Sequence, residues 1–208
     1  YELAQSTYYE NLLYAIALKH TDDKEHPEQT VLLAYQPDGT AVQELAVLSE
    51  TGIGTKFCEL FAHCGALWIG MSIEELHDMS DPALGIDTVA MNGSYVLYHY
   101  EIAEKKLTTL LHSSEEYHSS TNVFCNFQAD GEAVYFQLLT PDAGGLDSGL
   151  YQVNARPGVV QQMPQSAAML FAGYTVTDGM LLYPERAGHQ SETEEKIYDL
   201  HMLNTKTG

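Results

Sequence analysis

The sequence predicts an all-β fold built from about four copies of a four-stranded antiparallel sheet. Apolar residues occur in short runs rich in Tyr, Val, Leu and Phe, which Gly, Pro, Asp and Asn separate, and this is the pattern of strands and turns. Similar runs recur along the chain, and each is followed by a second kind of run. The repeat of roughly 50 to 65 residues is typical of a β-propeller blade and too long for one coil of a solenoid.

The second strand of each repeat is the most recognisable, because it carries an aromatic residue at a similar place. These residues are Tyr14, Trp68, Tyr135 and Tyr183, and they are 54, 67 and 48 residues apart. We expect all four to occupy equivalent buried positions in four successive blades.

The other strands follow from the same alignment. First strands are expected at Glu2–Tyr8, Phe57–His63, Val123–Gln128 and Phe171–Val176. Third strands and their turns are expected within Val31–Gly39, Tyr95–Ile102, Gly149–Gly158 and Ile197–Gly208. Fourth strands are expected at Gln43–Leu48, Leu107–Leu111 and Val159–Met163, whereas the fourth repeat reaches Gly208 before its own.

One propeller domain is therefore expected over residues 1–208, with blades at 1–48, 56–112, 121–163 and 168–208. A single sheet cannot bury both of its faces, but blades that stack side by side bury them against each other. The blades could form a closed four-bladed ring or a partial arc of a larger propeller. The chain begins and ends inside the repeat pattern, which favours the arc.

The strand motifs resemble those of a known group of proteins. Gly179–Tyr183 is a Gly-x-Leu-Leu-Tyr strand, and Leu150–Asn154 and Leu203–Gly208 read Leu-Tyr-Gln-Val-Asn and Leu-Asn-Thr-Lys-Thr-Gly. These motifs are similar to bacterial extracytoplasmic propellers of the TolB-like and low-density-lipoprotein-receptor-like groups. The resemblance implies the fold and a secreted or surface-anchored bacterial protein, but no activity. Those propellers have six or seven blades, and this chain has fewer.

Charge and motifs exclude several functions. The formal net charge of −20 argues against binding to nucleic acid or to an anionic membrane surface. No apolar run has the roughly 18 residues of a spanning helix. The Gly-x-Ser-x-Gly, His-Glu-x-x-His, P-loop and EF-hand patterns are absent from the sequence. We therefore nominate no catalytic residue.

The three cysteines allow three interpretations. Cys58, Cys64 and Cys125 are too few for a disulfide scaffold, so buried free thiols are the simplest reading. A Cys58–Cys64 bridge is an alternative. Cys58 and Cys125 also both follow a phenylalanine on first strands, so a metal site that includes His63 is a third interpretation.

The acidic residues are unevenly distributed. Loops that join second to third strands, and those that join one repeat to the next, share one face of a propeller. They contain 18 of the 29 acidic residues, six of the nine histidines and only Lys24, Lys56 and Arg186 as basic residues. This acidic loop face either keeps the protein soluble or binds a cation or a basic partner.

The candidate binding residues lie mostly in one long loop, Ile73–Ser94, which we expect to rim the channel mouth with a short helix at Ile73–Met79. Tyr117 is a further candidate binding residue, because it lies in a polar loop where packing between strands does not account for an aromatic side chain. The binding set is Asp22, Asp23, Glu74, Glu75, His77, Asp78, Asp81, Asp87 and Tyr117. Within it, Asp78, Asp81 and Asp87 form a candidate calcium site, with Asp22 and Asp23 on the neighbouring loop.

The leading functional hypothesis is a non-enzymatic module that binds a protein or a small cationic ligand through the acidic loop face. The alternatives are a propeller hydrolase, or the substrate-gating part of one, and a structural spacer in a cell-surface protein. Since propellers host many functions, the fold does not decide between them.

Overall fold

The computed structural model describes residues 1–24, 27–40, 42–50, 58–78, 89–113, 123–140, 149–154, 158–163, 173–186 and 198–205. All regular secondary structure in these ranges is β-strand. The first sheet contains β1 (Glu2–Tyr9), β2 (Leu12–His20), β3 (Glu28–Tyr35) and β4 (Val42–Ser49). The second contains β5 (Cys58–His63), β6 (Ala66–Asp78), β7 (Val89–Glu101) and β8 (Lys106–His112). The third contains β9 (Val123–Asp130), β10 (Ala133–Leu139), β11 (Gly149–Asn154) and β12 (Gln161–Gln162).

The fourth sheet has three strands within the described residues, namely β13 (Thr175–Thr177), β14 (Met180–Arg186) and β15 (Tyr198–Asn204). In every sheet, neighbouring strands are consecutive in the chain and antiparallel. This confirms the repeated antiparallel sheet that the sequence predicts.

Tight turns join the first two strands of each sheet at one end of the molecule. Two-residue hairpin turns favour residues with positive φ, because this backbone conformation matches the twist of the strands. Three of the turns have positive φ at both residues: Glu10–Asn11, Cys64–Gly65 and Asp178–Gly179. Asn and Gly occupy the second place, where the left-handed conformation costs them least.

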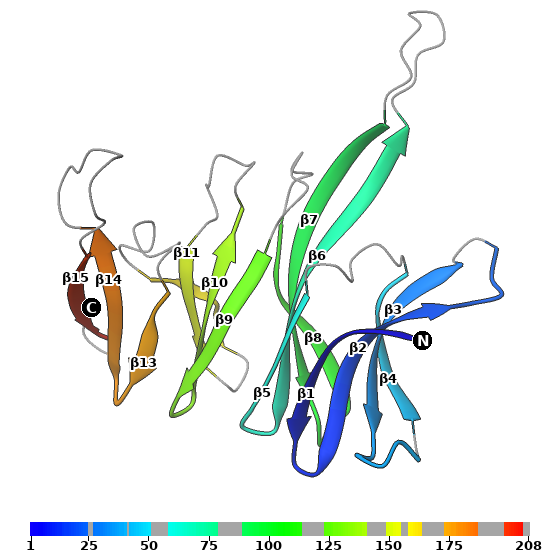
Figure 1. Cartoon of the computed structure of the whole chain (residues 1–208), viewed down its shortest axis with the longest axis horizontal. Coiled ribbons are helices and arrows are strands. Elements are labelled where there is room, and N and C mark those ends of the chain that lie inside the picture. The colour runs from blue at the N-terminus through cyan, green and yellow to red at the C-terminus, as the bar shows by residue number, and fades with distance from the viewer. Residues whose placement is uncertain are drawn as a thin grey trace, which may run out of the picture.

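The four sheets stand side by side, as the blades of a β-propeller do (Figure 1). The first and fourth sheets lie at opposite ends of this row, so the arrangement is an open arc. The first strands β1, β5, β9 and β13 of successive sheets contact one another along the row. Of the two arrangements that the sequence allowed, the closed four-bladed ring is therefore wrong.

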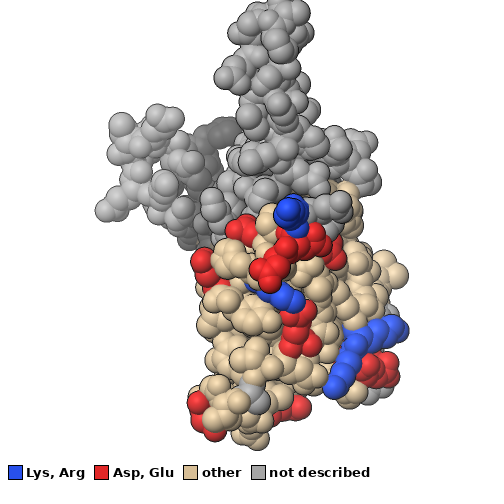
Figure 2. All heavy atoms as spheres, turned by 90° about the vertical axis from the view of Figure 1, so that its right-hand side faces the viewer, with Lys and Arg blue, Asp and Glu red and all other residues tan. Residues whose placement is uncertain are grey.

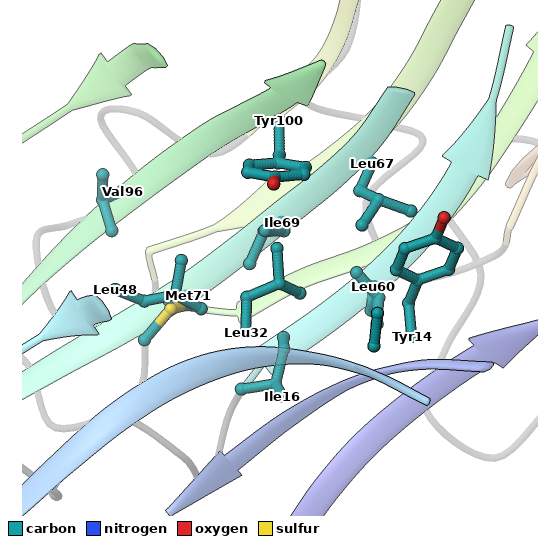
Figure 3. Close-up of a cluster of buried hydrophobic side chains, with 11 residues drawn as sticks. Tyr14, Ile16, Leu32, Leu48, Leu60, Leu67, Ile69, Met71, Val96 and Tyr100 are labelled. Carbon is teal, nitrogen blue, oxygen red and sulfur yellow. The ribbon is translucent and has the colours of Figure 1, made fainter. Parts of the chain in front are cut away.

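Each pair of neighbouring sheets encloses an apolar core. Between the first two sheets, Ile16 and Leu32 pack against Leu67, Ile69 and Met71 (Figure 3). Because strand side chains alternate between faces, Trp68 points the other way and joins the core with the third sheet. This alternation explains why β6 is apolar at consecutive positions.

The expected equivalence of the four aromatic residues is correct for three of them and wrong for Tyr183. Tyr14, Trp68 and Tyr135 pair with Thr7, Phe61 and Gln128 on their first strands, and each is the third residue of its strand. In the fourth sheet the residue in that register is Leu182, which pairs with Thr175. Tyr183 is one position later and faces the third sheet, where it shares a core with Tyr135. A shift of one residue moves a strand side chain to the opposite face.

Hydrogen bonds near the tight turns connect successive sheets. The Gly65 amide donates to the Tyr9 hydroxyl at 2.9 Å, and the His63 Nε2 donates to the Gly131 carbonyl at 2.8 Å. The Gly179 amide donates to the Asp130 carboxylate at 2.5 Å. All three sheet boundaries therefore have a polar contact at the turn end.

Polar groups at the edge of the third sheet also hold the fourth sheet in register. The Gln128 side chain donates to the Tyr174 carbonyl at 2.6 Å and accepts from the Val176 amide at 3.0 Å. The Tyr174 hydroxyl donates to the Asn126 carbonyl at 2.5 Å. Burial raises the pKa of Tyr174, so the hydroxyl remains a donor at physiological pH.

The second and third sheets approach each other closely at Gly70 of β6. A Cβ atom placed on Gly70 would lie 2.4 Å from the Phe124 Cβ and Cγ atoms on β9. Side-chain carbons do not approach to this distance, so the absence of a side chain at Gly70 sets the separation of the two sheets.

We expect Gly70→Ala to destabilise the protein by about 1–3 kcal/mol, because the added methyl group must push the third sheet away from β6. Urea denaturation followed by circular dichroism measures this change. The control is Gly39→Asn, since nothing lies within 4 Å of a Cβ at Gly39 and Asn tolerates its φ of +76°. Equal stability of Gly70→Ala and the wild type would contradict the packing described here.

Candidate functional site

The antiparallel strand order places the loops from second to third strands, and the connections between sheets, at the end opposite the tight turns. Figure 1 shows the corresponding ends of β2, β6, β10 and β14 at that end. The sequence predicts the acidic loop face at this end. Asp22 and Asp23 lie here and are exposed, whereas Asp81, Asp87 and Tyr117 are outside the described residues.

The predicted helix at Ile73–Met79 is wrong, because β6 continues as a strand to Asp78. Its partner β7 begins at Val89, and the pairing runs without a break from Ala66–Glu101 to Asp78–Val89. Glu74, Glu75, His77 and Asp78 are therefore strand residues, opposite Gly93, Asn92, Ala90 and Val89. Hydrogen bonding to β7 stabilises the extended conformation more than the local helix propensity of Glu74–Met79 favours a helix. Tertiary contacts commonly outweigh local propensity in this way. The 22-residue loop is in large part a two-stranded ribbon.

This ribbon is the most distinctive feature of the loop face. β6 and β7 each have 13 residues, whereas no other described strand has more than nine. In Figure 1 the two strands project well beyond the ends of the neighbouring sheets. The candidate residues on β6 are thus carried away from the sheet cores on a regular backbone.

The β2–β3 loop presents the two described candidate carboxylates. The Thr21 amide donates to the Pro27 carbonyl at 2.8 Å and closes the loop, and the Asp23 amide donates to the Thr21 hydroxyl at 3.2 Å. These bonds leave the carboxylates of Asp22 and Asp23 at the surface.

A histidine between two carboxylates lies next to this loop, and sequence reasoning missed the grouping. His20 Nε2 is 3.3 Å from Glu2 Oε1, and His20 Nδ1 is 3.3 Å from Glu28 Oε1. The strand register is what brings these groups together, because His20 pairs with Glu28 and Glu2 pairs with Leu18, which is two residues from His20. Figure 2 views this side of the molecule and shows acidic side chains below the grey residues, with basic side chains near them. The three groups are exposed, so solvent screens their attraction.

The proposed metal site at Cys58, Cys125 and His63 is wrong. His63 lies five residues along β5 from Cys58, or roughly 16 Å in an extended strand. Its Nε2 atom is engaged by Gly131 and lies 3.1 Å from the Cys64 sulfur. Among the described side chains, no group of three or more His, Cys, Asp or Glu residues is placed to hold a metal ion.

The Cys58–Cys64 bridge is also wrong, because none of the three cysteines forms a disulfide. Cys58 and Cys125 are half-buried on β5 and β9, so the interpretation of buried thiols is correct only in part and is wrong for Cys64. Burial, with a smaller effect of the nearby Glu59 carboxylate, raises the pKa of the Cys58 thiol to about 11. The same two causes raise the pKa of Cys125. Cys64 is exposed at the β5–β6 turn.

A groove of about 560 Å³ lies at the turn end, between the third and fourth sheets. Asp130, Glu132 and Asp178 line it together with Gln152 and Asn154. Sequence reasoning placed no site here, because the residues come from turns far apart in the chain. Acidic residues therefore occur at both ends of the molecule, which makes the turn end the natural control for the loop face.

No known family model and no curated protein sequence matches this chain. Its structure is similar to the β-propeller domain of the trilobed protease from Pyrococcus furiosus, with a TM-score of 0.31 and 8% identity over 99% of this chain and 68% of that one. It is also similar to an acylaminoacyl peptidase from Pyrococcus horikoshii, with a TM-score of 0.31 and 6% identity over 98% of this chain and 38% of that one. Likeness at this level carries no argument about function. The described residues contain no helix with the length and apolar character needed to cross a membrane.

We expect Cys64 to react with a disulfide reagent such as DTNB at pH 8 at least ten times faster than Cys58 or Cys125. The thiolate is the nucleophile, and a thiol with a pKa of about 11 is only roughly 0.1% ionised at pH 8. Absorbance at 412 nm measures the reaction. Cys64→Ser should remove the fast phase and Cys125→Ser should leave it, so a fast phase that persists in Cys64→Ser contradicts this assignment.

Proposed function

We propose that the protein is a non-enzymatic, extracytoplasmic binding module that recognises a cationic ligand or a basic protein partner through its acidic loop face. The observation that carries this proposal is the β6–β7 ribbon. It extends the second sheet beyond its neighbours, at the end where loop sequences are longest and most acidic (Figure 1).

The ribbon is suited to recognition for a physical reason. A two-stranded hairpin is only marginally stable alone, but here β5, β8 and the cores of the second sheet hold its base. A rigid scaffold that carries a projecting element is a common arrangement of binding proteins. The ribbon contributes Glu74, Glu75 and Asp78 in sequence, and the segment that follows adds Asp81 and Asp87.

The net charge supports a cationic partner. A charge of −20 creates a negative field that accelerates encounter with positive ligands and repels anions. The exposed carboxylates of Asp22 and Asp23 extend this field to the neighbouring β2–β3 loop.

A basic peptide tests the proposal. We expect fluorescein-labelled hexalysine to bind the wild type, measured by anisotropy at about 0.1 M NaCl. Neutralising the ribbon segment, by Glu74→Gln, Glu75→Gln, Asp78→Asn, Asp81→Asn and Asp87→Asn, should weaken the affinity at least tenfold.

The control removes the same number of charges at the turn end, by Glu10→Gln, Glu101→Gln, Glu104→Gln, Glu132→Gln and Asp178→Asn. We expect it to weaken hexalysine binding less than threefold. Equal losses in the two variants would mean that only net charge matters, and the assignment to the loop face would then fail.

We further propose that Asp78, Asp81 and Asp87 bind calcium, whose preferred ligands are carboxylate and carbonyl oxygens. At 100 times its dissociation constant, calcium would add about 2.7 kcal/mol to the free energy of unfolding. For a domain of this size we expect the melting temperature to rise by roughly 5–10 °C.

Calorimetry with CaCl₂ and with NaCl of matched ionic strength separates binding from screening. The calcium-specific shift should disappear in Asp78→Asn with Asp81→Asn and remain in Glu104→Gln with Glu132→Gln. Identical shifts in the two salts would reject a calcium site.

A further inference from the structure

A small cavity lies between the first two sheets, at the turn end of their shared core. It has a volume of about 110 Å³ and shares no residue with the groove between the third and fourth sheets. Gln43 and Lys105, which are exposed, border its opening. Side chains from both sheets form its interior, namely Leu12, Tyr14, Ala34, Leu45, Tyr100 and Ile102.

The strand register explains why space remains at this place. Ala34 on β3 pairs with Tyr14 on β2. The residues that pair with the equivalent aromatic side chains of β6 and β10 are His99 and Gln152. Alanine therefore stands where the second and third sheets have a longer side chain, and the core beside it is left unfilled.

The walls of the cavity are held by the backbone. The register between β3 and β4 shifts at Leu45, which makes this side chain an extra residue of β4. On the opposite wall, the Ile102 amide donates to the Gly65 carbonyl at 3.1 Å, and the Gly65 amide donates to the Tyr9 hydroxyl. The cavity is thus formed before any ligand enters it, which lowers the free-energy cost of binding.

Tyr100 gives the cavity a buried polar group (Figure 3). Tyr100 is 1% exposed, and among the described residues its hydroxyl has no hydrogen-bond partner. Burial raises the pKa of Tyr100, so the hydroxyl stays protonated and can donate a hydrogen bond. A buried hydroxyl without an acceptor destabilises the free protein, and an acceptor atom placed in the cavity would remove this cost.

The lining determines which kind of molecule fits. The volume exceeds the roughly 30 Å³ that one water molecule occupies in the liquid, and aliphatic side chains and aromatic rings form most of the interior. Apolar cavities of comparable size bind single-ring molecules. None of the described lining residues is acidic, so a cation finds no carboxylate here. The net charge of −20 repels anions, and a neutral ligand is therefore favoured.

We propose that this cavity binds a small neutral molecule with one apolar ring and one hydrogen-bond acceptor, such as a cyclic ketone, and that the Tyr100 hydroxyl donates to the acceptor. The ring occupies the space beside Ala34 and contacts Leu45 and Ile102. This site is separate from the acidic loop face, at the other end of the sheets, and it is a second binding function that does not depend on the first.

Cyclohexanone and methylenecyclohexane test the proposal, because the two rings have nearly the same shape and only the ketone carries an oxygen acceptor. Carbon-13 NMR spectra of the Leu12, Leu45 and Ile102 methyl groups, recorded during a titration, give each dissociation constant. We expect cyclohexanone to bind the wild type with a dissociation constant of about 1 mM, which suits a ligand of this size.

The Tyr100→Phe variant removes the hydroxyl and keeps the ring. It should weaken cyclohexanone binding at least fivefold, because a hydrogen bond is lost, and change methylenecyclohexane binding less than twofold. The matched control is Tyr98→Phe on the same strand, since the Tyr98 hydroxyl already donates to the Leu48 carbonyl at 2.9 Å and does not line the cavity. It should change neither affinity more than twofold.

The Ala34→Leu variant fills the cavity and should weaken both ligands at least tenfold, with far-UV circular dichroism as the check that it folds. If it does not fold, the comparison of Tyr100→Phe with Tyr98→Phe decides. Three results would overturn the proposal. They are unshifted methyl signals in the wild type at about 20 mM cyclohexanone, undiminished binding in a folded Ala34→Leu, and a Tyr100→Phe variant that binds cyclohexanone as the wild type does or loses both ligands equally.

Discussion

Burial of both faces of every sheet is the constraint on which the rest of this structure depends. A four-stranded sheet with apolar residues on both sides is unstable in water unless a neighbour covers each side. In β6 the alternation of Leu67, Trp68 and Ile69 meets this constraint, because the side chains enter two different cores. Gly70 then allows Phe124 to approach β6, because no side chain stands between them.

The same packing separates the molecule into two ends with different properties. At the turn end, polar contacts from Tyr9, His63 and Asp130 cross all three boundaries between sheets and fix the tight turns. At the loop end, β6 and β7 continue beyond the cores that the second sheet shares with its neighbours. The extension of β6 and β7 occurs at this end, where added length does not disturb the stacking.

The candidate site could be predicted only in part. The exposure of Asp22 and Asp23 followed from their place between two strands, and the structure agrees. The Glu74–Asp78 segment has the composition of a short helix, but Val89–Gly93 pairs with it and keeps it extended. The metal site suggested for Cys58, Cys125 and His63 is excluded by the length of β5, because Cys58 and His63 lie at its opposite ends. Such errors arise because distance along a strand and pairing between strands are not visible in composition.

The sequence by itself determined the strands, their order and the turns, because alternating apolar residues and residues with positive φ act locally. It also determined that the sheets must stack, since both faces of the second strands are apolar. The tertiary structure alone decided the register, and this is why Tyr183 faces the third sheet while Leu182 occupies the place equivalent to Trp68. It also decided that the row is open, which leaves Leu200 and Met202 at the surface. These features depend on contacts between residues far apart in the chain, which no local pattern encodes.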